Sequence, residues 1–137
     1  MTPQPSLAGW HPMVQHRDRA ALGRLLADDG VLHSPVVHTP QRGKAITLQY
    51  GAGAMQVLGS THLRYGRKIV GSHDARLAFS TRIDGIQTKG IDLMRWDDAG
   101  QLVDFKLMVR PLEAVNLLHL WMGQRLARLK SAPPGAP

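Results

Sequence analysis

The sequence predicts an α+β fold in which helices cover one face of a curved antiparallel sheet. Two observations support this prediction. Apolar residues recur at helical spacing in the first part of the chain, and four strand-like segments joined by short turns follow in its second half. Helices that precede a meander of strands usually pack together on one face of the sheet. With 137 residues, the chain has the length of a single domain.

The first two predicted helices are short. Trp10 and Val14 are spaced for one helical face, and Pro12 suits a first turn, so the first helix is expected to begin near Trp10. Asp18 is suited to cap the second helix, because its carboxylate can accept from a free backbone N–H. The run 28–30, Asp-Asp-Gly, is expected to end that helix.

A short strand and a longer helix are expected next. Residues 31–34 form the predicted strand, which Pro35 ends, and residues 40–43 form a turn. The predicted third helix spans Lys44 to Leu58, although its two internal glycines each cost about 1 kcal/mol relative to alanine.

Four long strands are expected after this helix, over residues 61–70, 73–84, 87–96 and 101–109. Asp84-Gly85 and the run 97–100 have the composition of hairpin turns. Alternation divides the last strand into two faces. The expected outer face carries Leu102, Asp104, Lys106, Met108 and Arg110, and the inner face carries Val103, Phe105, Leu107 and Val109.

The last predicted helix runs from Pro111 to Lys130 and is apolar on more than one side. One side can cover the sheet of the same chain. The other side, with Leu117, Leu120 and Trp121, is expected to contact a partner subunit or to cover a cavity. Residues 1–6 and 131–137 are expected to be disordered Pro-rich tails, which leaves one domain over residues 7–130.

Composition excludes several classes of function. The absence of cysteine excludes disulfides, thiol catalysis and thiolate metal sites. The net charge of +7 comes from cations scattered along the chain, with few aromatic residues between them, so a solvated basic surface is favoured over nucleic-acid binding. No apolar run is long enough to cross a bilayer and no secretory signal is apparent, so a cytoplasmic protein is expected.

The order of several short motifs resembles the nuclear transport factor 2-like superfamily, in particular its branch of ketosteroid isomerases and SnoaL-like polyketide cyclases. The resemblance covers about residues 10–110. It rests on the segments 25–29, 31–35, 90–96, 98–100 and 102–109, and on Gly43 at the start of a helix. It implies a cone-shaped, cystatin-like fold around a pocket, with the N-terminal helices on the concave face and twofold dimers packed sheet to sheet. It implies no metal and no cofactor.

Asp92 is the strongest candidate for a functional residue. It lies in the middle of a predicted strand between Ile91 and Leu93, where a bare carboxylate would be too costly to bury. It must therefore hold a proton or meet a cation. Asp92 matches the position at which ketosteroid isomerase has a protonated aspartate that donates to an oxyanion. The alternative is an aspartate that pairs with a histidine or arginine for structural reasons.

Two other catalytic positions differ from the isomerase pattern. The resemblance places the general base at Ser34 and the phenol of the oxyanion hole at Trp10. A neutral serine does not remove a carbon-bound proton unaided, so the sequence does not predict a ketosteroid isomerase. His33 and His38 flank Ser34 and titrate near neutrality; alternation directs His33 to the opposite face, so His38 is the favoured base. Tyr50 could replace the donor lost at Trp10.

Two hypotheses about function follow. The first is a protein that binds a hydrophobic carbonyl compound and acts on it by acid–base chemistry of the isomerase or cyclase type. The second is a non-catalytic ligand-binding or dimerisation module on the same fold. The expected pocket wall consists of Trp10, Phe79, Thr81, Ile83, Met94, Trp96, Phe105, Leu107 and Val109.

A homodimer is expected in both cases. Asp104 of one protomer could pair with Lys106 or Arg110 of the other across the outer faces of the two sheets. No metal site is predicted, because no two histidines show the helical spacing that such a site uses.

Overall fold

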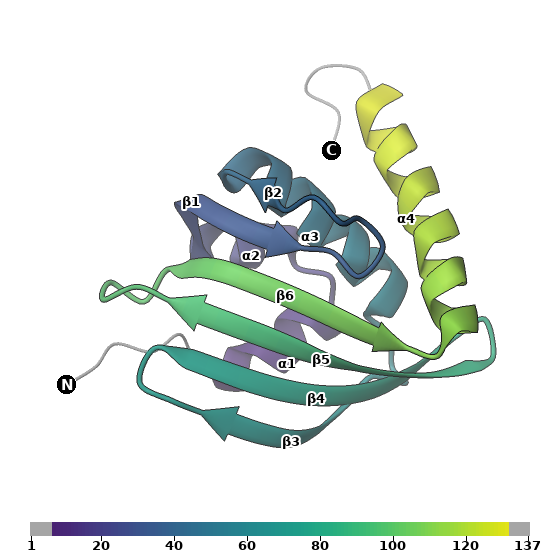
Figure 1. The fold of residues 1–137 in the computed structure, drawn as a ribbon, viewed down its shortest axis with the longest axis horizontal. Coiled ribbons are helices and arrows are strands. Elements are labelled where there is room, and N and C mark those ends of the chain that lie inside the picture. Colours follow the sequence, from purple (N-terminus) through teal and green to yellow (C-terminus); the bar gives the residue numbers. More distant parts are fainter. Residues whose placement is uncertain (1–6, 132–137) are drawn as a thin grey trace.

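One six-stranded sheet, with helices on its inner face, forms the part of the chain that the computed structural model describes, residues 7–131 (Figure 1). The predicted α+β fold is confirmed. The elements follow in the order α1 Leu7–Gln15, α2 Arg19–Leu25, β1 Leu26–His33, β2 Gln41–Arg42, α3 Lys44–Leu58, β3 Arg64–Val70, β4 Asp74–Ile83, β5 Ile86–Trp96, β6 Leu102–Arg110 and α4 Leu112–Ser131.

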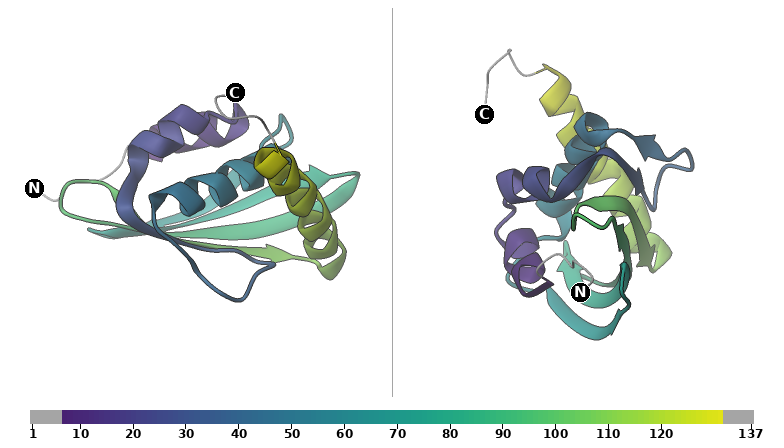
Figure 2. Two further views of the ribbon diagram at one scale, coloured as in Figure 1. Left: turned by 90° about the horizontal axis from the view of Figure 1, so that it is seen from above. Right: turned by 90° about the vertical axis from the view of Figure 1, so that its left-hand side faces the viewer.

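The sheet has the strand order β2-β1-β6-β5-β4-β3 and curves beneath the helices (Figure 2). All neighbouring strands are antiparallel except β1 and β6, which run parallel. Asp84 and Gly85 have positive φ angles of 50° and 79° at the β4–β5 turn, the conformation that a two-residue hairpin with the twist of its strands requires.

The start and end of the N-terminal helices differ from expectation. The N-cap at Asp18 is confirmed, because the Ala21 amide donates to its carboxylate at 3.0 Å. However, α1 already begins at Leu7, and α2 ends at Leu25. The predicted helix end at residues 28–30 is wrong, because these residues lie within β1. Pairing of Leu26 with β6, and a shift of register after it, place this turn-like run inside the sheet.

Helix α3 spans Lys44–Leu58 as predicted. The buried hydroxyl of Thr47 donates to the carbonyl oxygens of Gly30 at 3.0 Å and Gln41 at 3.2 Å. These bonds join α3 to β1 and to β2, so one side chain sets the height of the helix above the sheet.

Leu102 is a correction to the predicted faces of β6. It is 1% exposed and belongs to the core, not to the outer face. A register shift between Arg95 and Trp96 in the neighbouring strand breaks the simple alternation at this end of β6. The other outer-face residues, from Asp104 to Arg110, follow the predicted pattern.

Helix α4 lies at one end of the sheet and packs mainly against α3 (Figure 2). Leu118 and Met122 are fully buried in the core. Of the second stripe predicted on this helix, Leu117 and Trp121 pack half-buried against the chain's own core, and Leu120 remains 57% exposed. The stripe is therefore mostly covered without a partner.

The predicted tails, residues 1–6 and 131–137, lie outside the described residues, apart from Ser131 at the end of α4. Within residues 7–131 no helix has both the length and the apolar character needed to cross a bilayer.

Candidate functional site

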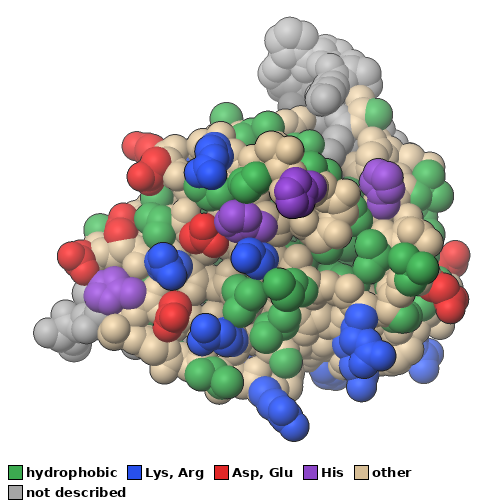
Figure 3. All heavy atoms as spheres, viewed as in Figure 1, with side chains coloured by type: hydrophobic (Ala, Val, Ile, Leu, Met, Phe, Trp, Pro, Cys, Tyr) green, Lys and Arg blue, Asp and Glu red, His purple; other side chains and the backbone are tan. Residues whose placement is uncertain are grey.

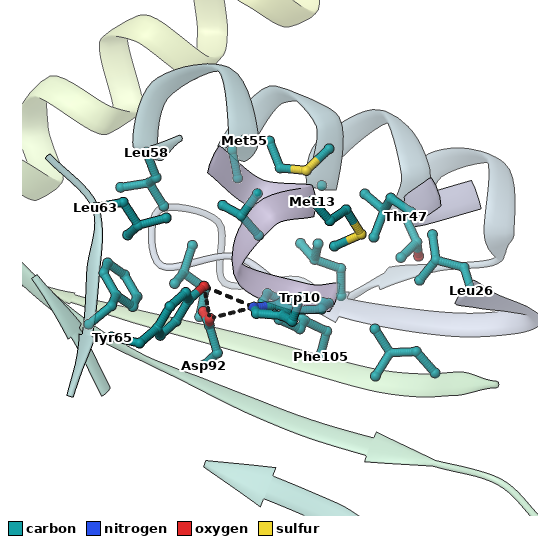
Figure 4. Close-up of a pocket in the computed structure, with 18 residues that line it drawn as sticks. Trp10, Met13, Leu26, Thr47, Met55, Leu58, Leu63, Tyr65, Asp92 and Phe105 are labelled. Atoms are coloured by element: carbon teal, nitrogen blue, oxygen red, sulfur yellow. Dashed lines mark hydrogen bonds between the residues drawn. The ribbon is translucent and has the colours of Figure 1, made fainter. Parts of the chain in front are cut away.

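Three polar side chains from three different elements meet in the core (Figure 4). Trp10 comes from α1, Tyr65 from β3 and Asp92 from β5. The indole Nε1–H of Trp10 donates to the Tyr65 hydroxyl at 2.9 Å and to Asp92 Oδ2 at 3.3 Å. The Tyr65 hydroxyl donates to the same carboxylate oxygen at 3.2 Å. We call these three residues the polar triad.

The sheet register places Asp92 on the inner face, beside Leu77 of β4 and Leu107 of β6. It is 3% exposed. Burial raises its pKa from 3.8 to about 7, and the hydrogen bonds from Tyr65 and Trp10 oppose this rise. Both hydrogen bonds end on Oδ2. In the protonated form, the oxygen left to carry the proton is Oδ1.

Tyr65 remains a phenol at any physiological pH. Its burial, together with the charge of Asp92, raises the pKa of the hydroxyl well above its ordinary value. Edge-to-face contacts with His11 and Phe79, at centroid distances of 5.1 Å and 6.1 Å, fix the plane of the ring. Tyr65 thus acts in the triad as a fixed hydrogen-bond donor.

The polar triad lies in the wall of an internal cavity of about 50 Å³ between the sheet and helices α1 to α3. Among the described residues, the one other polar side chain in that wall is Thr47, whose hydroxyl already donates to two backbone carbonyls. The remaining lining is apolar or glycine: Met13, Val14, Leu22, Leu26, Leu32, Gly51, Ala54, Met55, Leu58, Leu63, Phe79, Leu102, Phe105 and Leu107.

Several predicted pocket residues line this cavity, namely Trp10, Phe79, Phe105 and Leu107, together with Asp92. Four others are buried on the inner face but are absent from its wall: Thr81, Ile83, Met94 and Trp96. Of these four, Thr81 has its hydroxyl 3.4 Å from the hydroxyl of Ser60.

A second, wider hollow of about 630 Å³ lies beside β6, where the chain leaves the sheet after β1. It is lined by the segment 33–38 and by residues 106–109 of β6. Leu107 contributes to the lining of both spaces. Val109, which was predicted to line the pocket, lies in the outer hollow.

The predicted acid–base partners are not brought to Asp92. Ser34, His33 and His38 line the outer hollow, and His33 Nε2 lies 3.1 Å from Asp104 Oδ2 on the outer side of the sheet. Strand alternation explains the outward placement of His33, because its neighbour Leu32 points inward. Ser34 and His38 follow the end of β1 at His33, so alternation does not direct them to the cavity. Tyr50 packs against the core but does not reach the cavity wall, where its neighbour Gly51 lies.

Tyr65 was not among the site residues predicted from the sequence. The sequence did contain an indication that Tyr65 points inward. Tyr65 lies within a predicted strand that must pair with the strand carrying Phe79. The register of β3 and β4 places Tyr65 directly beside Phe79 and hence on the inner face. A bulge between Tyr65 and Lys68 hides the alternation in the rest of β3.

We expect Tyr65→Phe to raise the pKa of Asp92 further above 7. The substitution removes a donor that stabilises the carboxylate, while the burial that raises the pKa is retained. The measurement is a ¹³C NMR titration of protein labelled at aspartate carboxyl carbons. An unchanged or lower pKa would show that the Tyr65 hydroxyl does not bond to Asp92 in solution.

Comparison with solved structures gives three informative matches. A steroid delta-isomerase from Pseudomonas aeruginosa is 34% identical, with a TM-score of 0.84, over 96% of this chain and 100% of that chain. A protein with a cystatin-like fold from Silicibacter pomeroyi is 24% identical, with a TM-score of 0.83, over 93% of this chain and 92% of that chain. An NTF2-like protein from Mesorhizobium loti is 21% identical, with a TM-score of 0.65, over 81% of this chain and 100% of that chain.

The latter two matches concern the fold alone. No family model and no curated protein matches the sequence.

Proposed function

Because the chain belongs to the nuclear transport factor 2-like superfamily, we propose that it binds an apolar small molecule through one oxygen atom and promotes its enolisation. The observation that carries this proposal is the carboxyl group of Asp92, which is buried in an apolar wall with a pKa of about 7. A catalytic acid is most effective when its pKa lies near the working pH. The N–H of Trp10 and the O–H of Tyr65 already donate within the polar triad, so a proton on Asp92 is the donor left to orient a ligand by a single carbonyl oxygen.

The proposed reaction is a proton transfer. The α-carbon of the bound ketone loses a proton to a base, and the carbonyl oxygen accepts the Asp92 proton, which gives the neutral enol. The candidate base is His38, because it lines the outer hollow and is exposed, whereas His33 is bound to Asp104. A ligand that reaches both groups must extend from the internal cavity into the outer hollow, both of which Leu107 lines.

The ligand must also enlarge the cavity. Small-molecule sites commonly offer about 300 to 1,000 Å³, whereas the internal cavity measures about 50 Å³. Met13 and Met55 in its wall have flexible, unbranched side chains that can move apart at low cost. The small volume of this cavity favours a second candidate function, a non-catalytic module that binds a ligand or a partner on the same fold.

The test uses 2-tetralone, an apolar bicyclic ketone with acidic α-hydrogens. We expect the wild-type protein to accelerate exchange of these hydrogens with D₂O, as followed by NMR, and we expect Asp92→Asn to reduce the protein-dependent rate by about 100-fold. The protein-dependent rate should fall as the pH rises through about 7, because the acid form of Asp92 is lost. Asp104→Asn makes the same chemical change on the outer face and should leave the rate unaltered.

Binding of 2-tetralone without exchange would support the non-catalytic module instead. Absence of both binding and exchange for 2-tetralone and for 2-naphthol, its aromatic enol analogue, would contradict the proposal.

A further inference from the structure

The hydroxyl of Thr47 is a second polar point in the wall of the internal cavity. Thr47 lies on α3, lines the cavity and is 1% exposed. In Figure 4 its side chain lies at the opposite end of the cavity from Tyr65 and Asp92. A ligand that is held by the polar triad and fills the cavity therefore extends toward Thr47.

The hydrogen bonds of Thr47 leave its acceptor capacity free. A threonine hydroxyl carries one hydrogen and two lone pairs. The hydrogen is already shared between the carbonyl oxygens of Gly30 at 3.0 Å and Gln41 at 3.2 Å. Within residues 7–131, no group donates a hydrogen bond to Oγ1 in return. The Thr47 hydroxyl can therefore accept a hydrogen bond from a ligand but has no hydrogen left to donate.

The two ends of the cavity thus have opposite hydrogen-bonding character. Protonated Asp92 donates at one end, and Thr47 accepts at the other. The wall between them is apolar, so a ligand hydroxyl placed there would lose its hydrogen bonds to water without replacement.

The cavity wall also lacks cations. Figure 3 shows lysine, arginine and histidine side chains spread over one face of the molecule. None of these residue types lines the cavity in the described part of the chain. A carboxylate or phosphate inside the cavity would therefore remain unpaired, and the polar groups of a fitting ligand are neutral.

We propose that the ligand is an apolar ketone that also carries a hydroxyl group, and that Thr47 favours this ligand by accepting a hydrogen bond from the hydroxyl. The inference rests on the proposed function, which assigns the carbonyl oxygen to Asp92. Thr47 contributes to specificity and takes no part in the proton transfer. A site built to bond a ligand hydroxyl discriminates against the analogue that lacks it.

The test compares ligands on the wild-type protein. Isothermal titration calorimetry gives dissociation constants for 2-tetralone and for its four derivatives with one hydroxyl on the aromatic ring. The matching fluoro derivatives are the controls, because fluorine is similar in size to a hydroxyl but donates no hydrogen bond. We expect at least one hydroxy isomer to bind about tenfold more tightly than its fluoro counterpart. In that complex, the ring hydrogens beside the hydroxyl should show NOEs to the Thr47 methyl group, a readout that needs no variant.

Variants then assign the preference to one side chain. Thr47→Val should make the hydroxy and fluoro isomers bind equally, whereas Thr47→Ser keeps a hydroxyl and should retain the preference. Thr61→Val makes the same change at an exposed position and should also retain it. Asp92→Asn should weaken binding of both isomers but keep their ratio, because the two contacts lie at opposite ends of the cavity.

Equal binding of every hydroxy isomer and its fluoro counterpart to the wild-type protein would overturn the inference. Accelerated exchange of 2-tetralone would in that case leave the proposed function in place. A preference that survives in Thr47→Val, or that Asp92→Asn abolishes, would place the hydroxyl elsewhere and would also overturn the inference. A preference that depends on Thr47 without any exchange would support the ligand class and contradict the proposed enolisation.

Discussion

Replacing Asp92 with asparagine should stabilise the protein above pH 7. The wild-type folded state holds a proton on Asp92 up to about pH 7, whereas the unfolded chain releases it near pH 3.8. Unfolding between these values therefore releases a proton, and the stability due to protonated Asp92 is lost as the pH rises through about 7. Three pKa units correspond to about 4 kcal/mol, an upper value for the gain of Asp92→Asn at pH 8.

The measurement is urea denaturation of both proteins from pH 4 to pH 8. The two free energies of unfolding should be similar near pH 4, where the aspartate is neutral in the folded state, and should diverge as the pH increases. Taking the difference between the proteins cancels the titration of other groups. Asp104→Asn is the matched control and should not reproduce the divergence. Parallel stability curves for wild type and Asp92→Asn would show that Asp92 is not held protonated.

Gly59→Ala should destabilise the fold by about 3 kcal/mol, because the added methyl group overpacks a rigid site. A Cβ atom at this position would lie 2.2 Å from the carbonyl oxygen of Val14 and 2.7 Å from that of Met55. Both atoms belong to the backbone, so a side-chain rotation cannot relieve the clash. Arg17 also donates to the Gly59 carbonyl at 2.6 Å, so this junction joins α3 to the end of α1.

Thermal or urea unfolding measures the effect, with Gly23→Ala as the control. The nearest atom to a Cβ at Gly23 is Leu48 Cδ2 at 3.6 Å, an ordinary contact, so alanine should stabilise α2 by up to about 1 kcal/mol. Because α1 carries Trp10, Gly59→Ala should also displace the indole from Asp92. Equal unfolding curves for Gly59→Ala and wild type would contradict the packing at this junction.

The sequence allowed most of the fold to be predicted, because its local signals agree with its tertiary contacts. Helix α3 has the predicted bounds, and Asp84-Gly85 forms the predicted turn. The prediction was wrong where pairing between distant segments decides the structure. Residues 28–30 have the composition of a helix end, but contact with β6 draws them into a strand.

The candidate site was predicted only in part for the same reason. Asp92 could be identified from one strand, since a carboxylate flanked by apolar residues is conspicuous. Tyr65 could not be identified from a single strand. Its inward direction depends on the register of β3 with β4 and on the bulge that follows Tyr65. The placement of Ser34 and His38 depends on where β1 ends, and it ends at His33, so both residues lie in the segment that lines the outer hollow.

The parallel pairing of β1 with β6 also determines when the protein can fold. Leu26 and His33, near the N-terminus, find their partners at Leu102 and Lys106, close to the other end of the chain. A nascent polypeptide on the ribosome therefore exposes the apolar faces of α1, α2 and α3 until β6 has been synthesised. Closing so long a loop is slow compared with forming the local β4–β5 hairpin. The N-terminal half is thus the part of the nascent chain that most needs protection from aggregation.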